Sequence, residues 1–196
     1  MKKLLLLLIL VSLSYSVSYA ECNCDTTTAW TWDSISWDIP DDCWIWAEYE
    51  YRVVECNGIT QYEFRVLGWV AALTGCELEG YCTQPPCVWE FVSHSLLEEG
   101  VIPGFPVLQP GECRETYISV GPACWETVYR AIGPGGAGYY NYPCAETPVC
   151  CRGFKICKSY QNVVTITSLP YTPVACGAVI GPETGQPCFS VCYSQE

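Results

Sequence analysis

The sequence predicts an all-β fold made of disulfide-rich antiparallel hairpins, arranged either as a sandwich or as two small β units. Short runs of β-branched and aromatic residues alternate with turn residues along most of the chain. The chain contains 16 cysteines, a density close to that of disulfide scaffolds. No strong amphipathic helix pattern follows the N-terminal apolar stretch. Together these observations favour short strands that disulfides hold together.

The clearest element is a hairpin that turns at Asn57–Gly58, because this dipeptide favours the two-residue type I′ turn. Such a loop brings opposite charges together on one face, pairing Arg52 with Glu63 and Glu50 with Arg65. A slip of one residue would exchange the faces and lose these matches, so the pattern predicts the register as well as the hairpin. The other face then carries three apolar pairs: Val53 with Tyr62, Tyr51 with Phe64, and Tyr49 with Val66.

Tryptophans crowd the N-terminal third of the chain. The same register places Trp46 opposite Trp69, on the face that carries the charged pairs. Aromatic side chains among charged ones are typical of binding surfaces, whereas packing in a small core is the competing interpretation. Five tryptophans therefore form the candidate binding surface: Trp44, Trp46, Trp69, Trp30 and Trp32.

The rest of the chain predicts short strands between Gly, Pro and Asn residues. Residues 100–111 are rich in Pro and Gly and mark the expected connection between an N-terminal β unit, residues 21–99, and a C-terminal β unit, residues 112–196. A single domain with a long loop is the alternative. The remaining expected elements are strands at 88–93, 114–120 and 124–132, a helical turn at 95–99, a loop at 133–138, and a second hairpin of 153–160 with 163–169.

Residues 1–20 have the pattern of a signal peptide. Lys2 and Lys3 precede the apolar run Leu4–Leu13, and small residues follow at Ser18 and Ala20. The apolar run is too short to span a bilayer, which needs about 20 residues. We therefore expect a secreted or cell-surface protein without membrane insertion. The lysine-led signal indicates a bacterial source, with the periplasm as the alternative location.

Cysteines of exported proteins oxidise, so disulfides are the expected state of all 16. An even count allows eight bridges with none left over. The spacing lacks the paired short motifs of zinc sites, and no cofactor or metal is expected. The predicted disulfide cysteines are Cys22, Cys24, Cys43, Cys56, Cys76, Cys82, Cys87, Cys113, Cys124, Cys144, Cys150, Cys151, Cys157, Cys176, Cys188 and Cys192.

The acidic balance limits the partners of the chain. Removal of the signal peptide with its two lysines leaves seven basic and 21 acidic residues, a net charge of −14. Nucleic acid and anionic membranes are disfavoured, because both are bound through Lys and Arg. The simplest interpretation of the acidic residues is that they keep the protein soluble. The alternative is a calcium site, since four aspartates lie close in sequence: Asp33, Asp38, Asp41 and Asp42.

The sequence contains few residues and no motif that would indicate a catalytic site. His94 is the only histidine, and its expected role is packing or surface solvation. No nucleophile, metalloprotease or phosphate-loop motif is found, so we expect no enzyme, with a hydrolase that uses paired carboxylates as the alternative. The expected function is contact with a protein or glycan at a cell surface or in a matrix, as an adhesin, matrix component or surface-assembly subunit that could self-assemble. A carbohydrate-binding module with exposed Trp and Tyr is the second hypothesis.

Overall fold

A computed structural model describes residues 28–39, 43–72, 85–131, 137–144, 148–177 and 179–192. The predicted signal peptide lies outside these residues, and so does the side chain of Cys43. The expectations for those positions stay predictions. The same holds for six further residues named above: Cys22, Cys24, Asp41, Asp42, Cys76 and Cys82.

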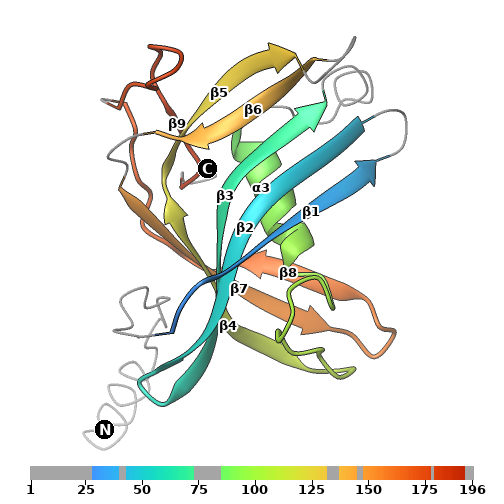
Figure 1. The fold of residues 1–196 in the computed structure, drawn as a ribbon. Helices are drawn as coiled ribbons and strands as arrows, with labels where there is room; N and C mark the ends of the chain where they lie inside the picture. The colour runs from blue at the N-terminus through green and yellow to red at the C-terminus, as the bar shows by residue number, and fades with distance from the viewer. Residues whose placement is uncertain are drawn as a thin grey trace, which may run out of the picture.

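The all-β prediction is confirmed. The described residues form nine strands, joined in one curled sheet of mixed direction, and one helix (Figure 1). The strands are β1 (Thr31–Ile39), β2 (Cys43–Cys56), β3 (Ile59–Ala72), β4 (Cys113–Pro122), β5 (Cys124–Ala131), β6 (Ala137–Pro143), β7 (Val149–Lys158), β8 (Val164–Ser168) and β9 (Phe189–Ser190), and the helix is α3 (Pro85–Leu96).

The sheet divides at β3, because the two halves of this strand pair with different neighbours. Residues 62–64 run parallel to β4, whereas residues 69–72 run antiparallel to β6. Along its other edge β3 pairs with β2, which in turn pairs with β1. One branch then continues as β4-β7-β8 and the other as β6-β5-β9, and the two diverge in Figure 1. Strands from both sides of residues 100–111 therefore share one sheet.

The predicted hairpin and its register are confirmed around the turn. Asn57 and Gly58 have φ values of 52° and 78°, the left-handed conformation that a type I′ turn requires at both positions. The charged and apolar pairs occur as predicted: Arg52 with Glu63, Glu50 with Arg65, Val53 with Tyr62, Tyr51 with Phe64, and Tyr49 with Val66.

Farther from the turn the register changes at a β-bulge. Tyr49 pairs with Val66, but the next residue of β2, Glu48, pairs with Gly68, which leaves Leu67 as an extra residue on β3. The bulge lies between the segment of β3 that pairs with β4 and the segment that pairs with β6. It therefore sits where the sheet divides.

This bulge overturns one prediction. Trp46 lies opposite Val70, and Trp69 lies opposite Ala47, so the expected Trp46–Trp69 pair is wrong. An extra residue exchanges the two faces for every position after it. Trp69 consequently points toward the same side as Tyr49, into the core, where it is 1% exposed.

The predicted strand at residues 88–93 is also wrong, because these residues belong to α3. Two prolines occupy the first turn, where their missing N–H groups and restricted φ are tolerated. Trp89, Val92 and Leu96 recur at helical spacing and are buried. The β-branched and aromatic residues of this segment suggested a strand, but burial of one helical face against the sheet outweighs such intrinsic preferences.

The other predicted β elements are confirmed. β4 and β5 occupy the two expected strand segments, and β7 pairs with β8 from Phe154 opposite Ser168 to Lys158 opposite Val164. Asn162 has a φ of 62° in the connecting turn, which it tolerates better than most residues. β5 and β6 form a further hairpin. Residues 137–138 of the predicted loop belong to β6, and the rest of that loop lies outside the described residues.

Four disulfides are placed in the described residues, and no described cysteine is free. Cys56, Cys87 and Cys151 are disulfide-bonded as well. One bridge joins facing residues of β4 and β7, and three tie the C-terminal segment to β5, β7 and the end of the β5–β6 hairpin. The four bridges are Cys113–Cys157, Cys124–Cys176, Cys144–Cys188 and Cys150–Cys192.

Candidate binding surface

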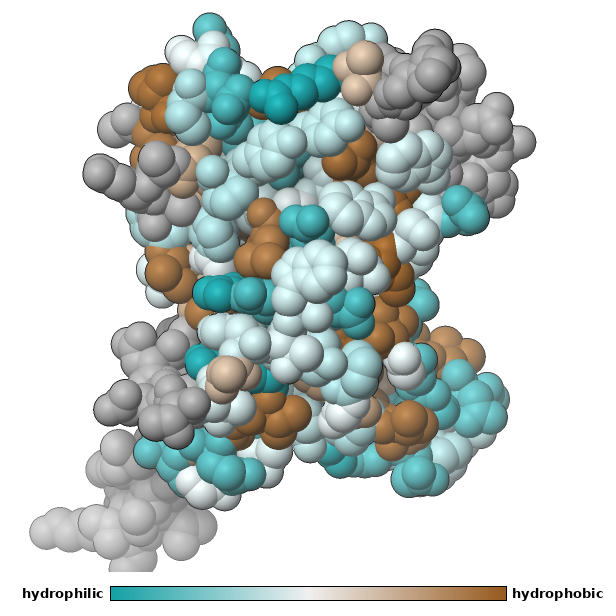
Figure 2. Space-filling view, viewed as in Figure 1, coloured by the Kyte–Doolittle hydropathy of each residue, from teal (hydrophilic) through white to brown (hydrophobic). Residues whose placement is uncertain are grey.

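The upper half of the sheet has two unlike faces. The inner face packs against α3, with Tyr49, Trp69 and Val92 among the buried residues of one large hydrophobic cluster. On β2 the alternate positions, which include Trp44 and Trp46, point to the opposite, outer face and are partly exposed. Figure 1 shows α3 behind β2 and β3, so the outer face is toward the viewer in Figures 1 and 2.

Four of the five predicted surface tryptophans belong to the outer face. Trp32 is 56% exposed, and Trp30, Trp44 and Trp46 are partly exposed. Trp69 does not belong to it, because its ring lies in the core at 4.5 Å from the ring of Trp125, centroid to centroid. The bulge that moves Trp69 inward could not be read from the alternation of residues.

Strand pairing extends the outer face across five strands. Ser36, Trp46, Val70, Tyr140 and Val128 face one another in a row from β1 to β5. Two strand spacings, about 10 Å, separate the backbones that carry the two aromatic residues of this row. Val70 is only 6% exposed although it points outward, which indicates that its larger neighbours cover it.

The tyrosines of β6 are functional candidates that sequence reasoning missed. Tyr140 and Tyr142 alternate on one face, and their rings are nearly parallel, with centroids 6.2 Å apart and an angle of 16° between planes. The alternation was visible in the sequence, but nothing local placed β6 beside β3. We call the five residues Trp32, Trp44, Trp46, Tyr140 and Tyr142 the outer aromatic face.

Figure 2 shows what surrounds these side chains. Pale side chains of intermediate hydropathy, the class that includes Trp and Tyr, spread over the middle of this face, with teal polar residues between them. Brown aliphatic residues occupy smaller areas there. The surface is therefore aromatic and polar in character, in contrast to an aliphatic oligomer interface.

The positive charges of the outer face are already paired. Arg52 Nη2 lies 2.6 Å from Glu63 Oε2, and Arg65 pairs with Glu50. The Trp30 ring covers both guanidinium groups, with its centroid 4.2 Å and 4.5 Å from their central carbons. A third outer arginine, Arg130, pairs with Glu183 at 2.7 Å. These arginines are consequently poor receptors for an additional anion.

Three carboxylates of the outer face, those of Asp38, Glu48 and Glu126, form no ion pair within the described part of the chain. Glu126 is buried, because the backbone of Glu183 and Thr184 lies over it and donates hydrogen bonds to its carboxylate. Asp33 lies on the other side of β1, where Tyr49 Oη donates to its Oδ2 at 3.3 Å. Burial, together with the nearby Asp33 carboxylate, raises the pKa of Tyr49 to about 12. Asp33 and Asp38 therefore do not converge on one ion, and the described residues contain no cluster of metal-ligating side chains.

His94 belongs to a polar contact between α3 and β7. Its Nε2 lies 3.3 Å from Glu90 Oε1, and its ring packs edge-on against Phe154. The His94 contact and the guanidinium of Arg152 hold the pKa of Glu90 below its usual value. Arg152 is 3% exposed and lies between the rings of Trp89 and Tyr171, 4.7 Å from each centroid. These contacts fasten the helix to the sheet.

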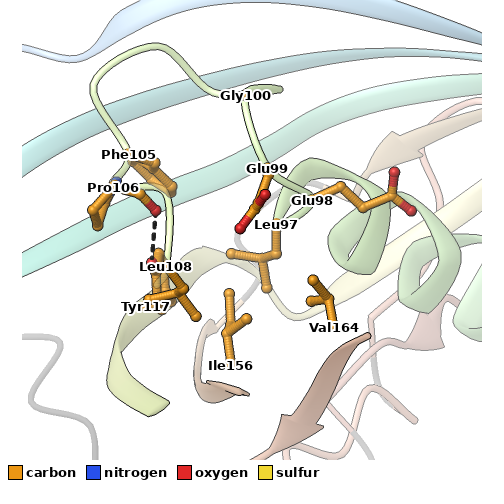
Figure 3. Close-up of a pocket in the computed structure, with 10 residues that line it drawn as sticks. All are labelled: Leu97, Glu98, Glu99, Gly100, Phe105, Pro106, Leu108, Tyr117, Ile156 and Val164. Carbon is orange, nitrogen blue, oxygen red and sulfur yellow. Dashed lines mark hydrogen bonds between the residues drawn. The ribbon is translucent and has the colours of Figure 1, made fainter. Parts of the chain in front are cut away.

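Glu98 and Glu99 border a small hollow between the end of α3 and strands β4, β7 and β8 (Figure 3). The hollow has room for about one water molecule. The Glu99 carboxylate is paired with Lys158 Nζ at 2.8 Å, and Tyr117 Oη donates to the Pro106 carbonyl at one side of the hollow. This place is too small to enclose a ligand.

Comparisons with protein-family models, with curated proteins and with solved structures returned no match. None of the helices in the described ranges has the length and apolar character needed to cross a bilayer. The described disulfides fit an oxidising compartment outside the cell. The function must therefore be argued from the chemistry of the outer face.

Proposed function

We propose that this protein is an exported, disulfide-stabilised contact protein that binds its partner through the outer aromatic face and catalyses no reaction. The predicted signal peptide and the cysteine content support export. The partner is a component of a cell surface or an extracellular matrix. Periplasmic residence in a bacterium remains the alternative location.

The observation that carries this proposal is the row of Trp46, Val70 and Tyr140. These residues point away from α3, and no described helix lies over them. Large aromatic side chains kept partly exposed cost the protein burial energy that the core could have used. Side chains of this kind contribute most of the binding energy at many interfaces.

The scaffold suits a contact role. The row crosses five hydrogen-bonded strands, so its side chains are held by the sheet and lose little freedom on binding. The inner face is filled by a hydrophobic cluster that includes α3. A rigid, preorganised surface supports binding by contact without a closing lid.

Self-assembly is a second candidate, because β1 is a nine-residue edge strand in the described sheet. Edge strands with unpaired backbone groups can pair with another chain. The acidic net charge opposes association of like copies, so we place this candidate second. Size-exclusion chromatography with light scattering separates the two, since edge pairing predicts a dimer whose formation survives loss of the aromatic residues.

The contact function is tested with the mature, oxidised protein on a defined panel of immobilised ligands: neutral, acidic and cationic polysaccharides, matrix proteins and basic peptides. The Trp46→Ala/Tyr140→Ala double variant should lose retention on the bound ligand by more than about tenfold. Tyr129→Ala is the matched control, because Tyr129 is 64% exposed but points to the other face of β5. The proposal fails if no panel member binds, or if the double variant binds as well as the parent protein.

A further inference from the structure

We infer that the ligand of the outer aromatic face is an extended, uncharged polysaccharide chain, an inference that rests on the contact function proposed above. It follows from the spacing of the strands that carry the rings, the partial exposure of the aromatic side chains and the charges of the face. Each of these observations limits the ligand in a different way.

The side chains of the outer aromatic face are spread along the sheet and do not enclose a pocket. We call the surface that runs across the strands through Trp46, Val70 and Tyr140 the track. Trp46 and Tyr140 stand on strands separated by β3, and the nearly parallel Tyr142 ring lies beside Tyr140. The row from β1 to β5 spans about 19 Å, four strand spacings. A ligand that lies along the whole row is long and extended.

Between Trp46 and Tyr140, β3 contributes no large side chain to the outer face. Val70, between the two aromatic residues, is almost fully buried, and its neighbour along β3 on the same face is Gly68, which has no side chain to obstruct a ligand. Flat sugar rings can lie across such a surface, because each ring has an apolar C–H face that packs on an aromatic ring. A folded protein partner would need protruding anchors and matching pockets.

The border of the track is polar. Ser34, Ser36 and Glu48 lie beside Trp46 on β1 and β2, with Asp38 farther along β1. Hydroxyl and carboxylate oxygens accept hydrogen bonds from the many hydroxyl groups at the edges of sugar rings. Aromatic faces with polar edges thus match the two kinds of surface on a sugar ring.

The charges exclude acidic polymers. The arginines of the face are each paired with a glutamate, while Asp38 and Glu48 are not paired within the described chain. An acidic polysaccharide would meet like charge in a protein that already carries a large negative net charge. The complementary chain is uncharged, and its binding should depend little on salt.

The test measures retention of the mature protein on cellulose, xylan, polygalacturonate, chitosan and an immobilised lysine-rich peptide, at low and high NaCl. We expect binding to cellulose or xylan, a change of less than about twofold with salt, and no binding to polygalacturonate. Trp46→Ala and Tyr140→Ala should each weaken that binding by more than about tenfold, whereas Tyr129→Ala should not. Glu48→Gln, which keeps a hydrogen-bond acceptor, should weaken it by less than about threefold.

The outcomes separate this inference from the contact function. Binding only to chitosan or the lysine-rich peptide, lost with salt and with Trp46→Ala, would overturn the uncharged polysaccharide and keep the contact function. Binding to cellulose or xylan that none of the outer-face variants affects would overturn both. Circular dichroism and the thiol count of each variant ensure that a loss of binding is not a loss of folding.

Discussion

Two regions of this molecule are held together by different means. In the packed region, β1, β2 and β3 with α3, long strands are hydrogen-bonded in ladders and their inner face is filled by large apolar side chains. In the bridged region, residues 169–192, the two-residue strand β9 is the only strand or helix among the described residues, and the buried cluster consists mainly of disulfide cysteines. Three bridges connect this region to the sheet.

The difference follows from how much backbone pairing each region can make. A ladder satisfies successive peptide groups and aligns side chains for burial, so the packed region closes its own core. The bridged region makes scattered backbone bonds, for example from Val191 N to the Ala123 carbonyl. Covalent links limit its unfolded conformations where packing alone would not. The outer aromatic face is built on the strands of the packed region and of the β5–β6 hairpin, so its geometry should depend mainly on packing.

The largest expected effect comes from reduction of the disulfides. Treatment with dithiothreitol should unfold the bridged region first, because little else orders it, while β2 and β3 keep their hydrogen-exchange protection. Amide exchange followed by mass spectrometry measures both regions in one experiment. Simultaneous loss of protection in both would show that the two regions fold as one cooperative unit.

Two disulfides that close loops of equal length allow a controlled comparison of the two regions. Cys113–Cys157 and Cys144–Cys188 both close loops of 44 residues, so the chain-entropy model assigns each about 4 kcal/mol. The first joins strands that are already paired, whereas the second holds irregular chain. Replacing either pair by alanine should lower stability similarly, but only loss of Cys144–Cys188 should raise exchange in the bridged region.

Loss of a core side chain in the packed region should lower the free energy of unfolding by nearly as much as loss of a disulfide. Trp69→Ala removes a fully buried ring that contacts Trp125 and should lower the free energy of unfolding by about 4 kcal/mol. Trp69→Phe keeps a ring and removes an indole N–H that has no partner within the described structure, so it should cost less than about 1.5 kcal/mol. Urea unfolding compares the variants. Equal losses would contradict a packing role for the ring.

Two arginines of the same hairpin should differ in effect. Arg52→Ala leaves the fully buried Glu63 carboxylate without its ion pair and should cost about 3 kcal/mol. Arg65→Ala removes a more exposed pair with Glu50 and should cost less than about 1 kcal/mol. Both variants lose contact with Trp30, which makes them matched controls. The comparison fails if Arg65→Ala is the more damaging.

Alkaline pH should destabilise the large hydrophobic cluster, which contains Tyr49 and Tyr117, with no effect near neutrality. The pKa values of Tyr49 and Tyr117 are raised from 10 to about 12, chiefly by burial. The folded state thus holds these protons more tightly, so their contribution is complete below pH 10 and is lost as the pH rises from 10 toward 12. Tyr49→Phe should reduce the loss of stability across this interval, measured by urea unfolding with disulfides intact. An unchanged pH profile would contradict the assignment.

How much could be predicted from sequence differs from element to element. The Asn57–Gly58 hairpin was predictable to the residue, because the turn and the facing pairs lie close together in the chain and support one register. The helix α3 was not predictable, because its β-branched and aromatic residues favour a strand. Only burial of one face against the sheet selects the helix. Tyr140 and Tyr142 alternate visibly, but their place beside β3 depends on contacts about 70 residues apart in the chain.

The sequence by itself determined the β class, the disulfide chemistry and the register near one turn, since these follow from composition and from contacts between near neighbours. Only the tertiary structure decided that Leu67 bulges, that Trp69 turns inward, and which cysteines pair. The bulge lies where β3 changes partners from β4 to β6, and the bridges join residues more than 40 positions apart. Such features depend on the simultaneous packing of distant segments, which no local pattern records.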